Sequence, residues 1–163
     1  MSADTFTSAM FLITAVLAAG VLINAVFPVV YNMAGTFNTA SHQSDERLRT
    51  DFKIITTLAD SNTETGNIWI KNVGSSAIPL YEIERSDVFF GPATSFDRRT
   101  YGSQWVADFT KADYDLNSNG YWDSGETVKI TVISATGFGS GDRVYFQFAL
   151  PNGIWRSTEF TAR

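Results

Sequence analysis

The segment from Asp115 to Glu126, DLNSNGYWDSGE, has residue types and a spacing that could bind a metal ion. It matches the calcium-loop pattern D-x-[DN]-x-[DN]-G-x5-E at every specified position. Ca²⁺ prefers roughly six to eight oxygen ligands, which carboxylates, amide oxygens and main-chain carbonyls can supply. The predicted ligands are the side chains of Asp115, Asn117, Asn119 and Glu126, the carbonyl of Tyr121, and Asp123 through a bridging water.

The same segment could instead be an ordinary loop between two strands. No helix is predicted on either side of it, and Asn in place of Asp at two ligand positions lowers the negative charge offered to a cation. Asn and Gly are also the residues that tight turns require, and Gly120 would permit a sharp turn here. The sequence therefore leaves two alternatives, a weak calcium site with a Kd of about 10⁻⁴ to 10⁻³ M or a turn without metal.

Catalytic chemistry is poorly supported by the composition. The chain has no cysteine and a single histidine, His42, so the Ser-His and Cys-His nucleophilic systems are excluded. Glu82 and Glu84 would lie about 7 Å apart on one face of a predicted strand, a spacing common on solvated sheets. With 12 basic and 17 acidic residues, the chain also lacks the basic patch that nucleic-acid binding requires. We predict neither an enzyme nor a nucleic-acid-binding protein.

The N-terminal part of the chain is almost uncharged. No Lys, Arg, Asp or Glu occurs between Thr5 and Ser44. The apolar run from Phe6 to Tyr31 is long enough, at about 1.5 Å per helical residue, to cross a hydrocarbon layer of about 30 Å. It lacks the basic region of a secretory signal and exceeds the usual length of its apolar core. It predicts a retained transmembrane helix of the type IV pilin kind.

Residues within this helix favour association with other helices. Ala15 and Ala19, with Gly20 beside them, form a small-xxx-small pattern that lets helix backbones approach closely in lipid. Pro28 removes the amide that would bond to the Asn24 carbonyl, so a kink is expected there. The Asn24 side chain could bond to its own backbone or to a partner helix. The alternative is a monomeric anchor in which these small residues are incidental.

The remaining chain divides at the point where the sequence periodicity changes. Residues 1–35 are predicted to form the membrane or assembly helix, and residues 36–50 a helical stalk or a linker. From residue 51 to 163, β-branched and aromatic residues alternate with polar ones between frequent turn signals. About seven or eight short strands predict an all-β, immunoglobulin-like antiparallel sandwich. The predicted strands are Phe52–Leu58, Asn67–Val73, Ile78–Ile83, Asp87–Phe90, Gln104–Thr110, Glu126–Ser134, Arg143–Leu150 and Ile154–Thr161.

Some surface properties of this domain can also be predicted. Trp105, Trp122 and Trp155 are either exposed binding anchors or members of the sandwich core. Arg47, Arg49 and Lys53 follow the helix and, by the positive-inside rule, would place this end in the cytoplasm, although acidic residues are interleaved with them.

Several phrases of the sequence together resemble a known family. KNVGSSAI at residues 71–78, SDVFF at 86–90, WDSGETVKIT at 122–131 and the closing hairpin, after a nearly uncharged helix, are similar to the archaellum accessory proteins FlaG and FlaF. These are relatives of the archaellins that build the archaeal flagellum. The resemblance covers nearly the whole chain, through short motifs.

The resemblance implies a stator subunit of the motility motor. Its helix would sit in the archaeal cell membrane, and its sandwich would lie outside, binding the surface layer or a sister subunit in a homo- or hetero-oligomer. An outward domain is the reason to set the positive-inside rule aside. A pilin-like subunit that polymerises into a surface filament is the alternative, disfavoured because no basic residue and Gly precede the apolar run. A third interpretation is a membrane-tethered calcium-binding β-domain.

Overall fold

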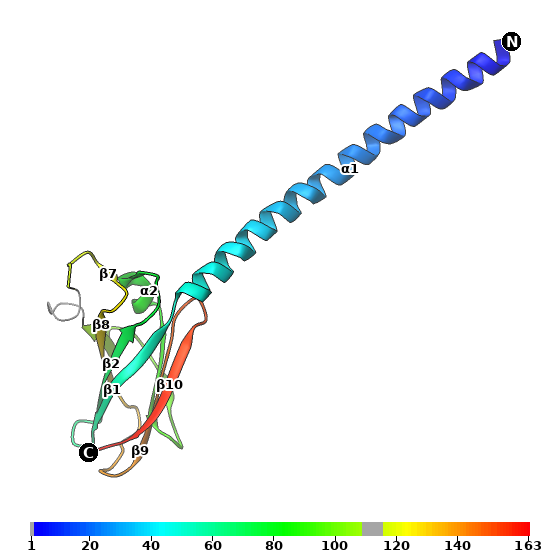
Figure 1. Cartoon of the computed structure of the whole chain (residues 1–163). Coiled ribbons are helices and arrows are strands. Elements are labelled where there is room, and N and C mark those ends of the chain that lie inside the picture. Colours follow the sequence, from blue (N-terminus) through cyan, green and yellow to red (C-terminus); the bar gives the residue numbers. More distant parts are fainter. Residues whose placement is uncertain (1, 109–115) are drawn as a thin grey trace. The chain divides into compact units, whose positions relative to one another are not determined.

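The computed structural model describes residues 2–108 and 116–163 of the 163-residue chain (Figure 1). Two compact units are present, residues 1–44 and residues 45–163. Helix α1 (Ser2–Arg49) makes up the first unit as far as Ser44. Its last five residues, 45–49, belong to the second unit. The second unit carries all of the strands. The predicted combination of a long apolar helix with an antiparallel β-sandwich is confirmed.

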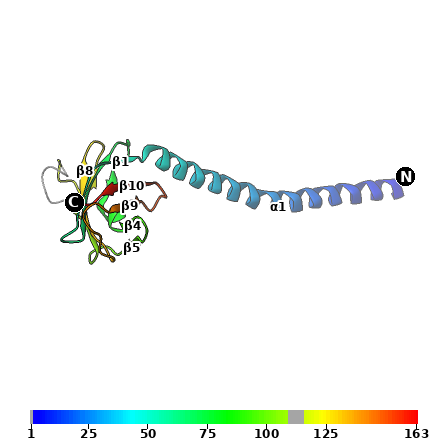
Figure 2. The same cartoon turned by 90° about the horizontal axis from the view of Figure 1, so that it is seen from below.

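Helix α1 is continuous through the polar segment 36–49, so this segment is helical in the structure. Pro28 lies inside the helix, and Figure 2 shows the coil continuing without a break and changing direction near its middle. The loss of one backbone hydrogen bond at Pro28 is tolerated because the bonds on either side hold the helix together. The hydroxyls of Thr7 and Thr14 donate to the carbonyls four residues earlier, at 2.9 and 2.8 Å, so neither is left unpaired in the apolar run.

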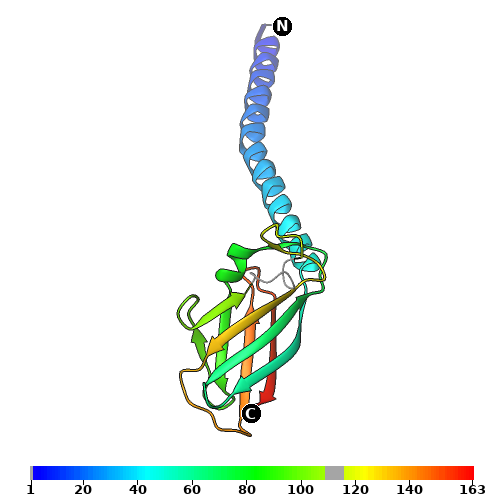
Figure 3. The ribbon, with the colours of Figure 1, turned by 90° about the vertical axis from the view of Figure 1, so that its left-hand side faces the viewer.

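Two four-stranded antiparallel sheets form the sandwich, as the two layers of strands in Figure 3 show. The first sheet contains, in spatial order, β1 (Phe52–Asp60), β2 (Thr65–Asn72), β8 (Thr127–Ile133) and β6 (Trp105–Asp108). The second contains β10 (Trp155–Thr161), β9 (Arg143–Ala149), β4 (Asp87–Pro92) and β5 (Asp97–Arg99). A two-stranded pair joins β3 (Ile78–Pro79) and β7 (Tyr121–Trp122).

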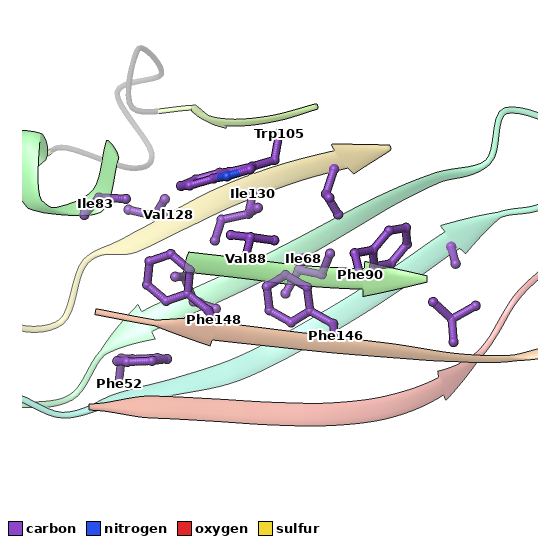
Figure 4. Packing of buried hydrophobic residues seen from close by; sticks show 14 of the residues in the cluster. Phe52, Ile68, Ile83, Val88, Phe90, Trp105, Val128, Ile130, Phe146 and Phe148 are labelled. Atoms are coloured by element: carbon purple, nitrogen blue, oxygen red, sulfur yellow. The ribbon is translucent and has the colours of Figure 1, made fainter. Parts of the chain in front are cut away.

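The core lies between the two sheets and follows the period-two pattern of the sequence. On β2 and β8 the buried residues Ile68, Ile70, Val128 and Ile130 point inward, at most 1% exposed, and their polar neighbours point outward. Figure 4 shows Phe146 and Phe148 of β9 among these side chains. Alternation thus decides which residues of each strand reach solvent.

The structure differs from the sequence prediction at Ile78–Ile83. Only Ile78 and Pro79 are extended there, and the short helix α2 (Leu80–Glu84) follows. Glu82 and Glu84 are therefore two residues apart on a helix, a spacing at which side chains do not face each other. Glu84 accepts a hydrogen bond from the Tyr101 hydroxyl at 3.2 Å. Burial, followed by the negative charge of Glu84, raises the pKa of Tyr101 above its ordinary value of 10.0.

The tryptophans divide between the core and the surface. Trp105 and Trp122 are each 1% exposed, so the prediction that they are exposed anchors is wrong and their alternative role in the core is confirmed. Trp155 is 54% exposed. The short strands β5 and β7 had no counterpart among the predicted strands, and residues 109–110 of the predicted strand Gln104–Thr110 lie outside the described residues.

Candidate functional site

The surface of α1 is apolar and exposed over its whole membrane-length part. Large apolar side chains from Phe6 to Tyr31 are between 48% and 72% exposed. A water-soluble monomer rarely presents an apolar surface of this extent. The helix is long and apolar enough to cross a membrane, with none of its apolar window buried inside the chain. This surface needs either lipid or other helices around it.

The residues predicted to mediate helix association form two rows on α1. Gly20, Asn24 and Pro28 are spaced by four residues and so lie along one side of the helix, while Ala15 and Ala19 form a second row. A Cβ atom added at Gly20 would meet no atom within 4 Å, so the space beside it is open to a neighbour.

Asn24 is the polar member of the first row. Its side chain makes no hydrogen bond to another residue of the part of the chain that the structure describes, in contrast to the hydroxyls of Thr7 and Thr14. It therefore does not repair the backbone that Pro28 loosens. An amide in an apolar helix is stabilised by bonding to a polar group of another helix, so bonding of Asn24 to a partner helix stays a prediction.

The end of α1 is fastened to the sandwich by the loop after β2. The carbonyl of Arg49 accepts hydrogen bonds from the amides of Ser75 and Ser76, at 2.8 and 3.1 Å. The carbonyl of Asp51 accepts two more, from Val73 at 3.0 Å and Gly74 at 2.9 Å. We call these paired segments, 49–51 and 73–76, the junction clamp. The clamp satisfies a carbonyl that a helix C-terminus would otherwise leave unpaired.

Two further features hold the junction clamp in place. Asn72 is fully buried, and its side-chain amide donates to the carbonyls of Ser76 and Trp122, both at 2.8 Å, while its oxygen accepts from Gly74. A Cβ atom at Gly74 would lie 2.4 Å from the Arg49 carbonyl oxygen, which only glycine avoids. The phrase KNVGSSAI carries the family resemblance, but its role in fastening the helix could not be read from the sequence.

The loop predicted to bind calcium is organised by its own hydrogen bonds. The side-chain amides of Asn117 and Asn119 both donate to Asp123 Oδ2, at 2.8 Å. Glu126 is 5% exposed, and its two carboxylate oxygens accept from the amides of Leu116, at 2.9 Å, and Asp123, at 2.8 Å. The structure thus brings these predicted ligands into one network.

The remaining positions of this loop fit either alternative left by the sequence. Asp115 lies outside the described residues, and Tyr121 lies in β7, paired with Pro79. Gly120 has a φ of 78°, so it makes the sharp turn expected of it. Among the described residues, no three His, Cys, Asp or Glu side chains come together as a metal-binding group. Each carboxylate oxygen carries two lone pairs, so a cation could bind beside the hydrogen bonds that these side chains make to each other and to the backbone.

Comparison with solved structures places this architecture among archaellum proteins. The archaellum periplasmic stator protein FlaG from Sulfolobus acidocaldarius matches with a TM-score of 0.54 and 23% identity, over 68% of this chain and 99% of that chain. The stator protein complex of FlaF and FlaG from the same organism matches with a TM-score of 0.53 and 23% identity, over 67% and 87%. The archaeal flagellum of Methanospirillum hungatei strain JF1 matches with a TM-score of 0.56 and 16% identity, over 91% and 90%. At these identities the likeness concerns the fold.

Sequence comparison gives the family. An uncharacterized protein of Archaeoglobus fulgidus is 28% identical over 165 residues, covering 99% of each chain. The sequence model of the archaeal-type flagellin family matches residues 8–160, which include most of α1 and nearly all of the sandwich. The combination of an exposed apolar helix, a clamped junction and an eight-stranded sandwich is therefore that of a member of the archaeal-type flagellin family.

Proposed function

We propose that this chain is a stator subunit of the archaellum, anchored in the cell membrane and self-associating through α1, with its sandwich outside the cell. The observation that carries the proposal is the exposed apolar surface of α1 on a chain whose sandwich has the fold of FlaG. A stationary anchor needs a part held in the membrane and a part that reaches a fixed structure, and the two units of this chain suit those tasks.

The junction clamp suits a subunit that bears load. Force on the sandwich reaches the helix through residues 49–51. The backbone amides of residues 73–76 donate hydrogen bonds to this segment and so fix it to the loop that follows β2. An ion pair between Asp51 and Arg156, at 2.6 Å, ties it to the second sheet as well. Both sheets therefore hold residues 49–51 in place.

An outward sandwich is compatible with the charges that follow the membrane helix. Arg47 lies 16 residues beyond Tyr31, which at 1.5 Å per residue places it about 24 Å past the apolar run. Arg49 is also within 3.8 Å of the Asp45 carboxylate. The positive-inside rule weakens with distance from the membrane, so these arginines oppose an outward orientation only weakly.

We take the partner of the sandwich to be the surface layer or a sister archaellum subunit. FlaF and FlaG of Sulfolobus acidocaldarius are found together in one complex. A second chain of the same fold is therefore a reasonable partner for this sandwich, in addition to further copies of the chain itself.

Cell fractionation tests the proposal. We expect the native protein to stay in the envelope fraction at low copy after the filaments are sheared off, and we expect its deletion to stop swimming while filaments are still assembled. Recovery of this chain as the main band of the sheared filaments would contradict a stator role.

A filament subunit is the second candidate, favoured by one observation. The match to the Methanospirillum hungatei flagellum extends over 91% of this chain, whereas the matches to the stator structures extend over at most 68%. A match of that extent must include part of α1. If the sheared filaments consist of this chain and its deletion removes them, the filament role replaces the stator role.

A further inference from the structure

The outward face of the first sheet gathers lysines from three adjacent strands. Lys53 of β1 lies directly opposite Lys71 of β2, and Lys129 of β8 lies opposite Trp69 of β2. The residues between them in sequence, such as Ile70 and Ile130, are buried in the core, so these four side chains point away from it. We call Lys53, Lys71, Lys129 and Trp69 the lysine face.

Asp108 of β6 lies directly opposite Lys129, whereas Lys53 and Lys71 lie opposite each other. All four ion pairs among the described residues use arginine, so none of the three lysines has a carboxylate oxygen within 4.0 Å in that part of the chain. Like charges directly opposite each other on a sheet are destabilising, which applies to Lys53 and Lys71. Lys129 Nζ instead lies 5.5 Å from the centre of the Trp69 ring, a cation–π contact. The facing pair Lys53 and Lys71 is thus a like-charged contact that lowers the stability of the isolated domain.

The outward face of the second sheet is arranged differently. There Arg98 pairs with Asp87 at 2.5 Å, and Arg143 pairs with Glu159 at 3.7 Å. Both arginines named on that face are in ion pairs, whereas the facing pair Lys53 and Lys71 has no ion pair in the part of the chain that the structure describes. The difference indicates that the lysine face meets negative charge from outside the chain.

A second copy of this chain can supply that negative charge. Residues 45–163 contain all 12 basic residues and 16 of the 17 acidic ones, and four of the basic residues are lysines. The surface of a copy outside its lysine face is therefore rich in carboxylates that the arginines do not balance. Trp69, with the exposed Val106 (44%) and Ile133 (46%) on the same sheet, adds the flat apolar area that a protein contact requires.

We propose that the lysine face of one copy docks on the carboxylate-bearing surface of a neighbouring copy. The inference deepens the proposed function and rests on self-association through α1, which raises the effective concentration of neighbouring sandwiches so that a weak contact is populated. A contact between two different surfaces is heterologous, so it can repeat from copy to copy in a ring or a row. Either form of assembly suits a subunit that works in multiple copies.

Carbodiimide crosslinking of the full-length protein in mild detergent tests the docking, because this reagent joins a lysine amine directly to a carboxylate in contact with it. Isotopically heavy and light copies are mixed, so a crosslink between copies is recognised by mass. We expect heavy-to-light crosslinks at Lys53, Lys71 and Lys129, reduced about tenfold when salt is raised from about 0.05 M to about 1 M, where charges are screened beyond about 3 Å.

Two triple variants separate the lysine face from overall charge. Lys53→Gln, Lys71→Gln and Lys129→Gln together remove the amines that the reagent joins, so their effect is measured as a lower association constant by light scattering, in the same direction as the effect of salt. The matched control Gln147→Glu, Ser157→Glu and Thr161→Glu makes the same change in net charge on the outward face of the second sheet and should leave the crosslinks in place. Assembly that persists through α1 without crosslinks between copies at these lysines would overturn the inference alone. Loss of all assembly in the wild-type protein would overturn the proposed self-association as well.

Discussion

Asp123 and Glu126 accept hydrogen bonds within the 116–126 loop through carboxylate oxygens that are also predicted metal ligands. Both asparagine side chains reach Asp123 Oδ2, and both oxygens of Glu126 accept backbone amides. A cation would have to bind these oxygens beside the donors that they already accept. Calcium binding at this loop stays a prediction from the sequence pattern. The loop brings the predicted ligands of residues 116–126 into one hydrogen-bonded network.

Calcium titration of the full-length protein measures this prediction. With a Kd near the weak end of the extracellular range, about 10⁻³ M, a calcium concentration about ten times higher should stabilise the folded sandwich by about 1.4 kcal/mol. The thermal midpoint should therefore rise by several degrees, and Glu126→Gln should abolish the rise. An unchanged midpoint in the wild-type protein at about 10 mM calcium, ten times that Kd, would end the calcium hypothesis.

Gly74 tests the junction clamp at the residue scale. In Gly74→Ala the new methyl would lie 2.4 Å from the Arg49 oxygen and 2.5 Å from the Asp51 nitrogen, both of them backbone atoms that cannot turn aside. We expect the free energy of unfolding to fall by on the order of 1–3 kcal/mol, measured by chemical denaturation of the full chain.

Gly139→Ala is the control for Gly74→Ala, because the nearest atom to its methyl would be the Asp142 side-chain oxygen at an ordinary 3.4 Å. Its stability should stay close to that of the wild type. Equal stability of the two variants would mean that the clamp does not constrain residues 49–51.

At the scale of elements, α1 is the part of the molecule most open to a partner. Gly20 and Asn24 share one side of the helix, with open space at Gly20 and an amide at Asn24 that no described residue bonds. If a second helix packs along this row, the space at Gly20 would admit its backbone and the Asn24 amide could bond to one of its polar groups.

Leucine substitutions along this row probe that packing. Asn24→Leu should weaken self-association in detergent about fivefold, the equivalent of one interhelical hydrogen bond of about 1 kcal/mol. Gly20→Leu should weaken it further by preventing close approach, although it strains nothing in the single helix. The apparent mass by light scattering gives the association constants.

Ala18→Leu is the matched control, since Ala18 lies outside both rows at about 100° per residue. Association that is equally strong in Asn24→Leu, Gly20→Leu and Ala18→Leu would show that this row is not the contact.

Sequence periodicity was sufficient to predict the longer strands and which of their side chains are buried. It was insufficient to predict the short elements. The alternation in NIWIKNV and ETVKITVIS places Ile68 and Ile70 in the core and Lys71 and Lys129 outside, as the structure has them. Asn152-Gly153 correctly predicts the hairpin between β9 and β10, where Gly153 has a φ of 84°.

The failures occur where tertiary contacts decide the local structure. Residues 80–84 alternate as a strand would, yet they form α2, with Ile83 fully buried in the core. Trp122 is held inside the sandwich by its hydrogen bond to the Glu126 carbonyl, at 2.9 Å, and β7 is too short to show periodicity. The junction clamp depends on residues more than twenty positions apart, which no local pattern reveals.

At the scale of the whole molecule, one claim supports the others: α1 stays in the membrane and the sandwich lies outside the cell. The apolar surface of the helix supports the first part, and the distance of Arg47 from the apolar run makes the second part possible. Helix association, the docking of the lysine face and a stator role all require this arrangement.

Labelling of intact cells measures this arrangement directly. The chain has no cysteine, so a single one introduced by Ser124→Cys, at an exposed position of the loop before β8, reports on the sandwich alone. The account predicts that a membrane-impermeant maleimide labels this cysteine in intact cells and that the labelled protein stays in the membrane through an alkaline carbonate wash. Labelling only after the cells are lysed, or release of the protein by the wash, would contradict it.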